Sequence, residues 1–76
     1  MRIDQIALLM QAGDISTAYL LPAPLKDNKW TIQFERKNGE QVPLTAQRAN
    51  VRHFSSLDSA WKILIELGFS SAVIRR

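Results

Sequence analysis

The clearest pattern of hydrophobic and polar positions lies in residues 29–36. Trp30, Ile32 and Phe34 alternate there with polar side chains, and a period of two is typical of a β-strand with one buried face. A domain this small needs its aromatic side chains in the core, so the pattern predicts that this aromatic face is buried. The alternative use of Trp30 and Phe34 is an exposed platform on which nucleic-acid bases stack.

A hairpin is predicted directly after this strand. The pair Asn38-Gly39 lies between two alternating segments, and Asn-Gly favours a type I′ turn because that turn needs positive φ at both central residues. Val42 and Leu44 then belong to the returning strand.

Two further strands are predicted on either side of this hairpin. Residues 15–21 are rich in strand formers, and Pro22 ends the run. One parity of that strand carries Ile15, Thr17, Tyr19 and Leu21. A second extended piece around Ala49, Val51 and His53 places Arg48 and Arg52 on the opposite parity. Together these pieces predict a meander of three or four antiparallel strands.

The N-terminal segment has the period of an amphipathic helix. Its apolar positions are Ile3, Ile6, Ala7 and Met10, and the pattern stops at Gly13, which predicts a C-cap there.

A second helix is predicted over residues 57–67. Ser55 or Ser56 supplies the N-cap, and Gly68 is placed for a left-handed cap with Phe69 folding back on the last turn. The apolar stripe consists of Leu57, Ala60, Trp61, Leu64 and Leu67. Residues 72–74 then form a short last strand.

These elements predict one α+β domain over residues 1–76, in the order α-β-β-β-β-α-β. We expect two layers, with a mainly antiparallel sheet of four to five strands and two helices. The helix over 57–67 should pack across the face that carries Trp30, Ile32 and Phe34.

Composition adds several exclusions. The 76 residues include no cysteine, so disulfides and cysteine-ligated metals are excluded. His53 is the single histidine, and the three glycines stand far apart, so we expect no metal, no cofactor and no nucleotide loop. Helix capping accounts for Ser55, Ser56 and Asp58 without a catalytic triad, so we expect no enzymatic activity. No apolar run is long enough to cross a membrane, and we expect a cytoplasmic protein.

Charge gives the first functional hypothesis. The formal net charge is +3 and the sequence pI is about 9.8, which favours DNA or RNA as a partner. If the aromatic face is buried, the opposite sheet face becomes the candidate nucleic-acid-binding surface. Its candidate residues are Arg48, Arg52, Lys29, Lys37, Arg75 and Arg76. The alternative is an ordinary solvated surface, since acidic residues are interspersed with these cations.

Sheet edges give the second functional hypothesis. A mixed sheet with a short last strand leaves backbone donors and acceptors that a second copy or another protein could pair with. The segment 18–25 is apolar enough to be an interface if it lies outside the core. A homodimeric interaction or regulatory module is therefore the alternative function.

Three pieces of the sequence resemble a small domain carried by bacterial plasmids and integrated elements. They are the strand Trp30–Arg36, the Asn38-Gly39 turn, and the stretch from Arg52 through Ala60 to Leu67-Gly68-Phe69. The resemblance covers roughly the C-terminal two thirds of the chain and excludes the N-terminal helix and the strand with Tyr19. It implies an accessory role in plasmid replication or partition, and no catalytic residue carries over.

Overall fold

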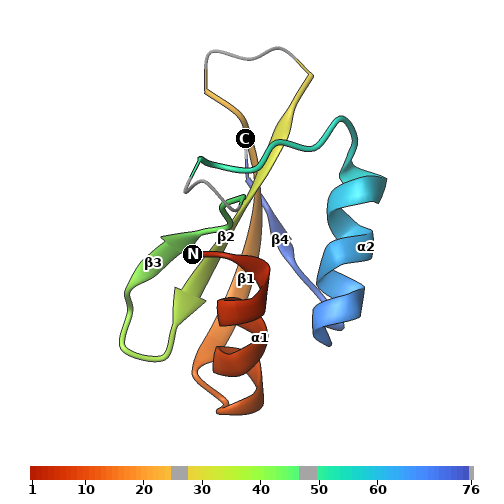
Figure 1. Ribbon diagram of the computed structural model, residues 1–76. Helices are drawn as coiled ribbons and strands as arrows, with labels where there is room; N and C mark the ends of the chain where they lie inside the picture. The colour runs from red at the N-terminus through yellow and green to blue at the C-terminus, as the bar shows by residue number, and fades with distance from the viewer. Residues whose placement is uncertain (25–27, 47–49, 76) are drawn as a thin grey trace.

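The computed structural model describes residues 1–24, 28–46 and 50–75. Its elements in chain order are α1 (Ile3–Gln11), β1 (Ile15–Pro22), β2 (Trp30–Arg36), β3 (Gln41–Pro43), α2 (Leu57–Leu67) and β4 (Val73–Ile74). The four strands form one sheet in the order β3-β2-β1-β4 (Figure 1). This arrangement confirms the predicted α+β class with two helices and a mainly antiparallel sheet.

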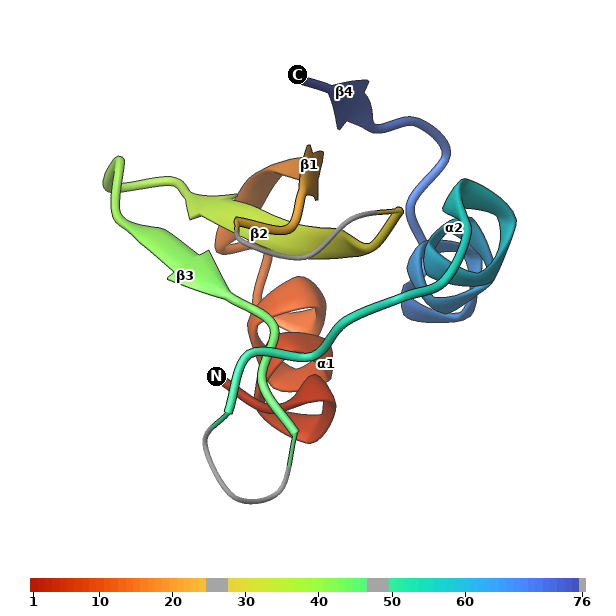
Figure 2. The same ribbon diagram turned by 90° about the horizontal axis from the view of Figure 1, so that it is seen from above.

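Both helices lie on the same side of the sheet, as the view from above shows (Figure 2). α2 contacts β1 and β2 and also touches α1. The opposite side of the sheet, which we call the open face, has no helix over it in the part of the chain that the structure describes. The fold therefore has two layers, one covered sheet face and one open sheet face.

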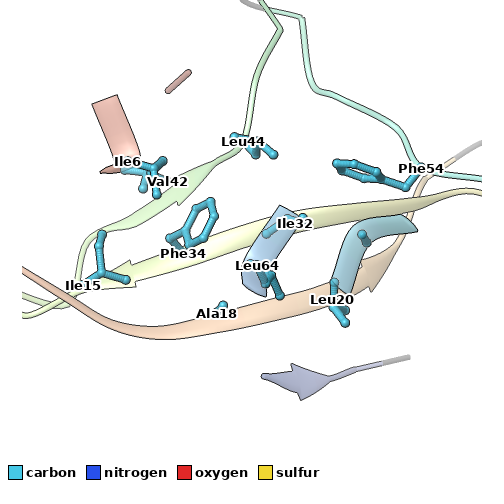
Figure 3. Close-up of a cluster of buried hydrophobic side chains, with 11 residues drawn as sticks. Ile6, Ile15, Ala18, Leu20, Ile32, Phe34, Val42, Leu44, Phe54 and Leu64 are labelled. Atoms are coloured by element: carbon cyan, nitrogen blue, oxygen red, sulfur yellow. The ribbon is translucent and has the colours of Figure 1, made fainter. Parts of the chain in front are cut away.

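The core lies between the sheet and the two helices (Figure 3). Its largest fully buried side chains are Phe34, Ile6, Ile32, Leu44 and Leu64. Because Ile32 and Phe34 are completely buried, the predicted orientation of β2 is confirmed. Trp30 is half-buried at the margin of the same cluster.

α2 has the ends that its sequence predicts. Ser56 is the N-cap, and its Oγ accepts a hydrogen bond from the Ser59 N–H at 3.1 Å. Gly68 ends the helix at a φ of 101°, where glycine has no steric penalty. Phe69 then folds back and stacks on Phe34, with the ring centres 5.7 Å apart. This contact attaches the chain after α2 to the core.

α1 ends one residue earlier than the sequence suggested. Ala12 is the C-cap, and Gly13 follows it at a φ of 72°. Gly13 thus takes the left-handed position just after the cap, where the Schellman-type helix end requires it.

The β2–β3 hairpin is present, but its turn is not of type I′. Gly39 has a φ of 89°, whereas Asn38 is not among the described residues with positive φ. The Gly39 N–H donates to the Arg36 carbonyl, and the Arg36 N–H donates to the Glu40 carbonyl. This is the pattern of a type I turn followed by a bulged glycine, so the two strands are joined by one more residue than a type I′ turn allows.

β1 differs from its predicted alternation because of an irregularity between Ile15 and Thr17. The extra residue there reverses the parity of the strand that follows. Ala18 and Leu20 are consequently the buried residues of β1, while Tyr19 lies on the open face. The predicted single face of Ile15, Thr17, Tyr19 and Leu21 is therefore wrong after Ile15.

The strand predicted around Ala49, Val51 and His53 is not a strand in the described residues, and Ala49 itself lies outside them. Val51 forms an isolated bridge with Thr45, and Phe54 forms another with Trp30. The partner changes within a few residues because this segment crosses the end of the sheet instead of running beside one strand.

β4 returns to the sheet after α2 and pairs with β1 in parallel. Tyr19 is the partner of Val73, and Leu20 is the partner of Ile74. This pairing makes β4 the edge strand of the sheet on the side away from β3.

Candidate interaction site

The backbone of β4 presents hydrogen-bonding groups on its outer side. The Arg75 N–H donates to the Leu20 carbonyl at 3.0 Å, so this N–H points toward β1. Backbone groups alternate in direction along a parallel strand, and the N–H and C=O of Ile74 therefore point away from β1. No partner for these two groups is found among the described residues. β4 can accept a further strand at this position.

The side chains of β4 lie on both faces of the sheet. Val73 shares the open face with Tyr19, and Ile74 shares the covered face with Leu20. Val73 is 42% exposed and Ile74 is 53% exposed. The free backbone edge is thus flanked by exposed apolar side chains on both sides.

An apolar depression lies next to this edge, between α2 and β4. Its volume is about 330 Å³. The lining residues are Leu20, Leu57, Asp58, Trp61, Ser71, Ala72 and Ile74. Among the described lining residues, Asp58 alone carries a charge. The depression lies on the same side of the sheet as the Ile74 side chain, so a strand added to β4 would direct alternate side chains into it.

The open face next to β4 carries a chain of polar contacts. The guanidinium carbon of Arg75 lies 4.3 Å from the centre of the Tyr19 ring. The Tyr19 hydroxyl donates to Glu35 Oε1 at 2.8 Å. The hydrogen bond to Glu35 raises the pKa of Tyr19, with smaller upward contributions from burial and from the Glu35 charge, whereas the Arg75 charge lowers it.

The opposite edge of the sheet is partly occupied. The N-terminal amine of Met1 donates to the Pro43 carbonyl at 2.9 Å, and the Thr45 N–H donates to the Met1 carbonyl at 2.8 Å. Pro43 has no N–H of its own to offer. β3 is therefore a poorer place than β4 for an added strand.

The predicted nucleic-acid-binding residues that the structure describes do not gather in one place. Lys29 precedes β2 and Lys37 follows it, so the two lie at opposite ends of a seven-residue strand, about 23 Å long at the usual rise. Arg75 ends near the start of β2 because β4 runs parallel to β1 and β1 antiparallel to β2. Arg48 and Arg76 lie outside the described residues.

Arg52 lies on the covered side of the sheet, apart from Arg75. Its guanidinium carbon is 5.1 Å from the centre of the ring of Phe54, a core residue. It also lines a second depression beside the first turn of α1, with a volume of about 410 Å³. The other lining residues there are Arg2, Ile3, Asp4, Thr45 and Ala46. The structure thus separates Arg52 from the open face on which it was expected.

The predicted interface over 18–25 is also changed. Ala18, Leu20 and Ala23 are buried, and Leu25 lies outside the described residues. Trp61 packs against the core, as its spacing with Leu57 and Leu64 predicts. It also lines the depression beside β4, a second role that helical spacing alone does not reveal.

Other chemistry is not assembled in the described ranges. They contain no group of three or more His, Cys, Asp or Glu side chains that could hold a metal ion. Neither α1 nor α2, the helices of the described chain, is long and apolar enough to cross a membrane. Exposed apolar residues elsewhere, such as Leu8 and Ile65, lie on helices without a free backbone edge beside them.

The fold and this edge define a small two-layer α+β domain with one strand edge open to a partner. Comparisons of the chain with protein-family models, with curated proteins and with solved structures found no match. The resemblance to a plasmid-borne domain accordingly stays a prediction.

Proposed function

We propose that this chain is a non-enzymatic interaction module that takes up a strand of a partner polypeptide along β4. One observation supports the proposal above all. The backbone N–H and C=O of Ile74 point away from the sheet, and the exposed side chains of Val73 and Ile74 flank them on the two faces. The apolar depression between α2 and β4 lies beside them. Strand addition gains main-chain hydrogen bonds from such an edge and gains specificity from pockets for alternate side chains. The homodimeric module expected from the sequence is one form of this function.

Selection of random peptides displayed on phage against the folded protein tests the proposal. The key variant is Ile74→Lys, and the matched control is Ile65→Lys, because both isoleucines are 53% exposed. We expect selected peptides to bind the wild type and the Ile65→Lys control alike and to lose at least about tenfold in affinity for Ile74→Lys. Peptides that bind all three proteins equally, or a selection that yields none, would reject the proposal.

Nucleic-acid binding is the second candidate function. The placement of Lys29 and Arg75 at the same end of the sheet favours it, together with the net charge of +3. Phosphate contacts by such cations would make affinity fall steeply with salt. In either case the resemblance suggests an accessory protein of a bacterial plasmid that acts in the cytoplasm.

Fluorescence anisotropy with labelled single-stranded and double-stranded oligonucleotides tests this second candidate at low and moderate salt. Lys29→Ala/Arg75→Ala and Arg48→Ala/Arg52→Ala are the test variants, and Lys62→Ala is the control. Each lost phosphate contact should reduce the salt slope by about 1. Absence of binding at low salt would remove nucleic acid as a partner.

A further inference from the structure

The geometry points to an extended acidic segment of another protein as the occupant of the β4 edge, an inference that rests on the proposed function. This segment places an acidic side chain beside Arg75 on the open face. Its next residue places a bulky apolar side chain over the depression between α2 and β4. The residue after that is apolar and lies beside Val73.

The backbone of β4 fixes this order of side chains. Ile74 offers both its N–H and its C=O outward, so one residue of the added strand lies directly opposite it. The side chain of that residue points to the covered face, as that of Ile74 does. Its two neighbours point to the open face, opposite Arg75 and Val73. In an antiparallel arrangement, which is the slightly more stable pairing, the residue opposite Arg75 comes first in the partner's sequence.

The covered face selects an apolar side chain for the central position. The depression there is lined mainly by the side chains of Leu57, Trp61, Ala72 and Ile74. Asp58 is also part of its lining, and a like charge would be repelled from this position. An acidic residue is therefore accepted only on the other face of the added strand.

The open face selects an acidic side chain. Arg75 rests against the Tyr19 ring, which holds the guanidinium in place. No carboxylate within ion-pair distance of Arg75 is found among the described residues, and Glu35 accepts the hydrogen bond of Tyr19. A positioned guanidinium binds a carboxylate with two parallel hydrogen bonds, which gives strength and direction.

A second copy of this chain fits the edge less well than such a segment. Self-pairing around Ile74 would place Arg75 opposite Val73 of the second copy. The C-terminal stretch 70–76 contains no acidic residue that could pair with Arg75. The two copies would also bring their arginines close to each other, which is unfavourable.

Three labelled probe peptides test the inference without any change to the protein. The first has the sequence Thr-Glu-Leu-Val-Thr, the second exchanges the central residues to Thr-Leu-Glu-Val-Thr, and the third replaces the acid to give Thr-Lys-Leu-Val-Thr. We expect the first peptide to bind most tightly by fluorescence anisotropy, with the other two weaker by about tenfold or more. Equal binding of all three would overturn the inference.

Charge-reversal variants of the protein provide a second test of the inference. Arg75→Glu should weaken binding of the first peptide and strengthen binding of the third. Lys37→Glu, at the other end of β2, should leave both affinities unchanged. If peptide binding depends on Ile74 but not on the acidic residue of the peptide, the proposed function is retained and the acidic occupant is rejected. Dimerisation that Ile74→Lys abolishes in sedimentation equilibrium, or binding of an oligonucleotide in place of any peptide, would also reject it.

Discussion

Arg75 lies over the ring of Tyr19, with its guanidinium carbon 4.3 Å from the ring centre. The contact joins the residue directly after β4 to the middle of β1. β4 itself pairs with β1 over two residues. The interaction of a charge with an aromatic ring therefore adds to the few backbone hydrogen bonds that hold this strand in the sheet.

Arg75→Ala should loosen β4 without unfolding the domain. A cation over an aromatic ring contributes about 0.5–1 kcal/mol at an exposed site, which is small for the whole domain and large for a short strand. We expect faster amide hydrogen exchange at Val73 and at the alanine in position 75, measured by NMR, and a small change in Tm. The control Lys37→Ala should change neither, and unchanged exchange in Arg75→Ala would show that the ring contact does not hold β4.

Tyr19 should titrate at higher pH than a free tyrosine. Its pKa is raised chiefly by the hydrogen bond to Glu35, and it is the single tyrosine of the chain, so tyrosinate absorbance reports on it alone. Because the folded state binds this proton more tightly than the unfolded state, the associated stability is present below a pH of about 10 and is lost as pH rises through the raised pKa.

Glu35→Gln should bring the Tyr19 titration back toward that of a free tyrosine. The substitution removes the negative charge and weakens the acceptor of the tyrosine hydroxyl. If the titration does not move, the Tyr19–Glu35 contact is absent in solution.

Leu64→Asp should unfold the protein. Leu64 is completely buried in the core, and an unpaired charge there costs more than about 3 kcal/mol, a large share of the stability of so small a domain. Ile65→Asp, one residue further along the helix and 53% exposed, is the control that should melt within a few degrees of the wild type. A cooperative melt of Leu64→Asp close to that of the wild type would mean that α2 presents a different side to the sheet.

Gly39→Ala should destabilise the hairpin by about 1 kcal/mol. Gly39 has a φ of 89°, and no atom lies within 4 Å of where a Cβ would be, so the cost is conformational and not steric crowding. Asn38→Gly should bring no gain, since the observed turn does not need positive φ at that position. Urea denaturation of the three proteins measures this, and a stabilised Asn38→Gly would support the type I′ turn instead.

Local chemistry made most of the fold predictable. The alternation around Ile32 and Phe34, the Ser56 cap and the left-handed Gly68 are each determined by neighbouring residues, and all three are confirmed. Ile74 was predictable as part of a short last strand, but its parallel pairing with β1 depends on contacts with residues far away in sequence.

The errors in β1 and in the β2–β3 turn each come from one extra residue. One residue inserted between Ile15 and Thr17 reverses the inside and outside of β1, and hydrophobicity does not reveal it because Tyr19, Leu20 and Leu21 are all acceptable on either face. The candidate cations were misplaced for a different reason. The cations were assigned to one face by parity, whereas the path of the segment around Arg52 crosses the end of the sheet.

The parallel pairing of β4 with β1 also has a consequence for the order of folding. β1, β2 and β3 pair with their neighbours in the chain, whereas β4 must wait for all of α2 to be in place before it reaches Tyr19 and Leu20. Contacts between residues so far apart in sequence carry a greater loop-closure entropy and form late. During folding, the outer edge of β1 is thus exposed until the last step, and a nascent chain that stalls there would present its longest strand to its neighbours.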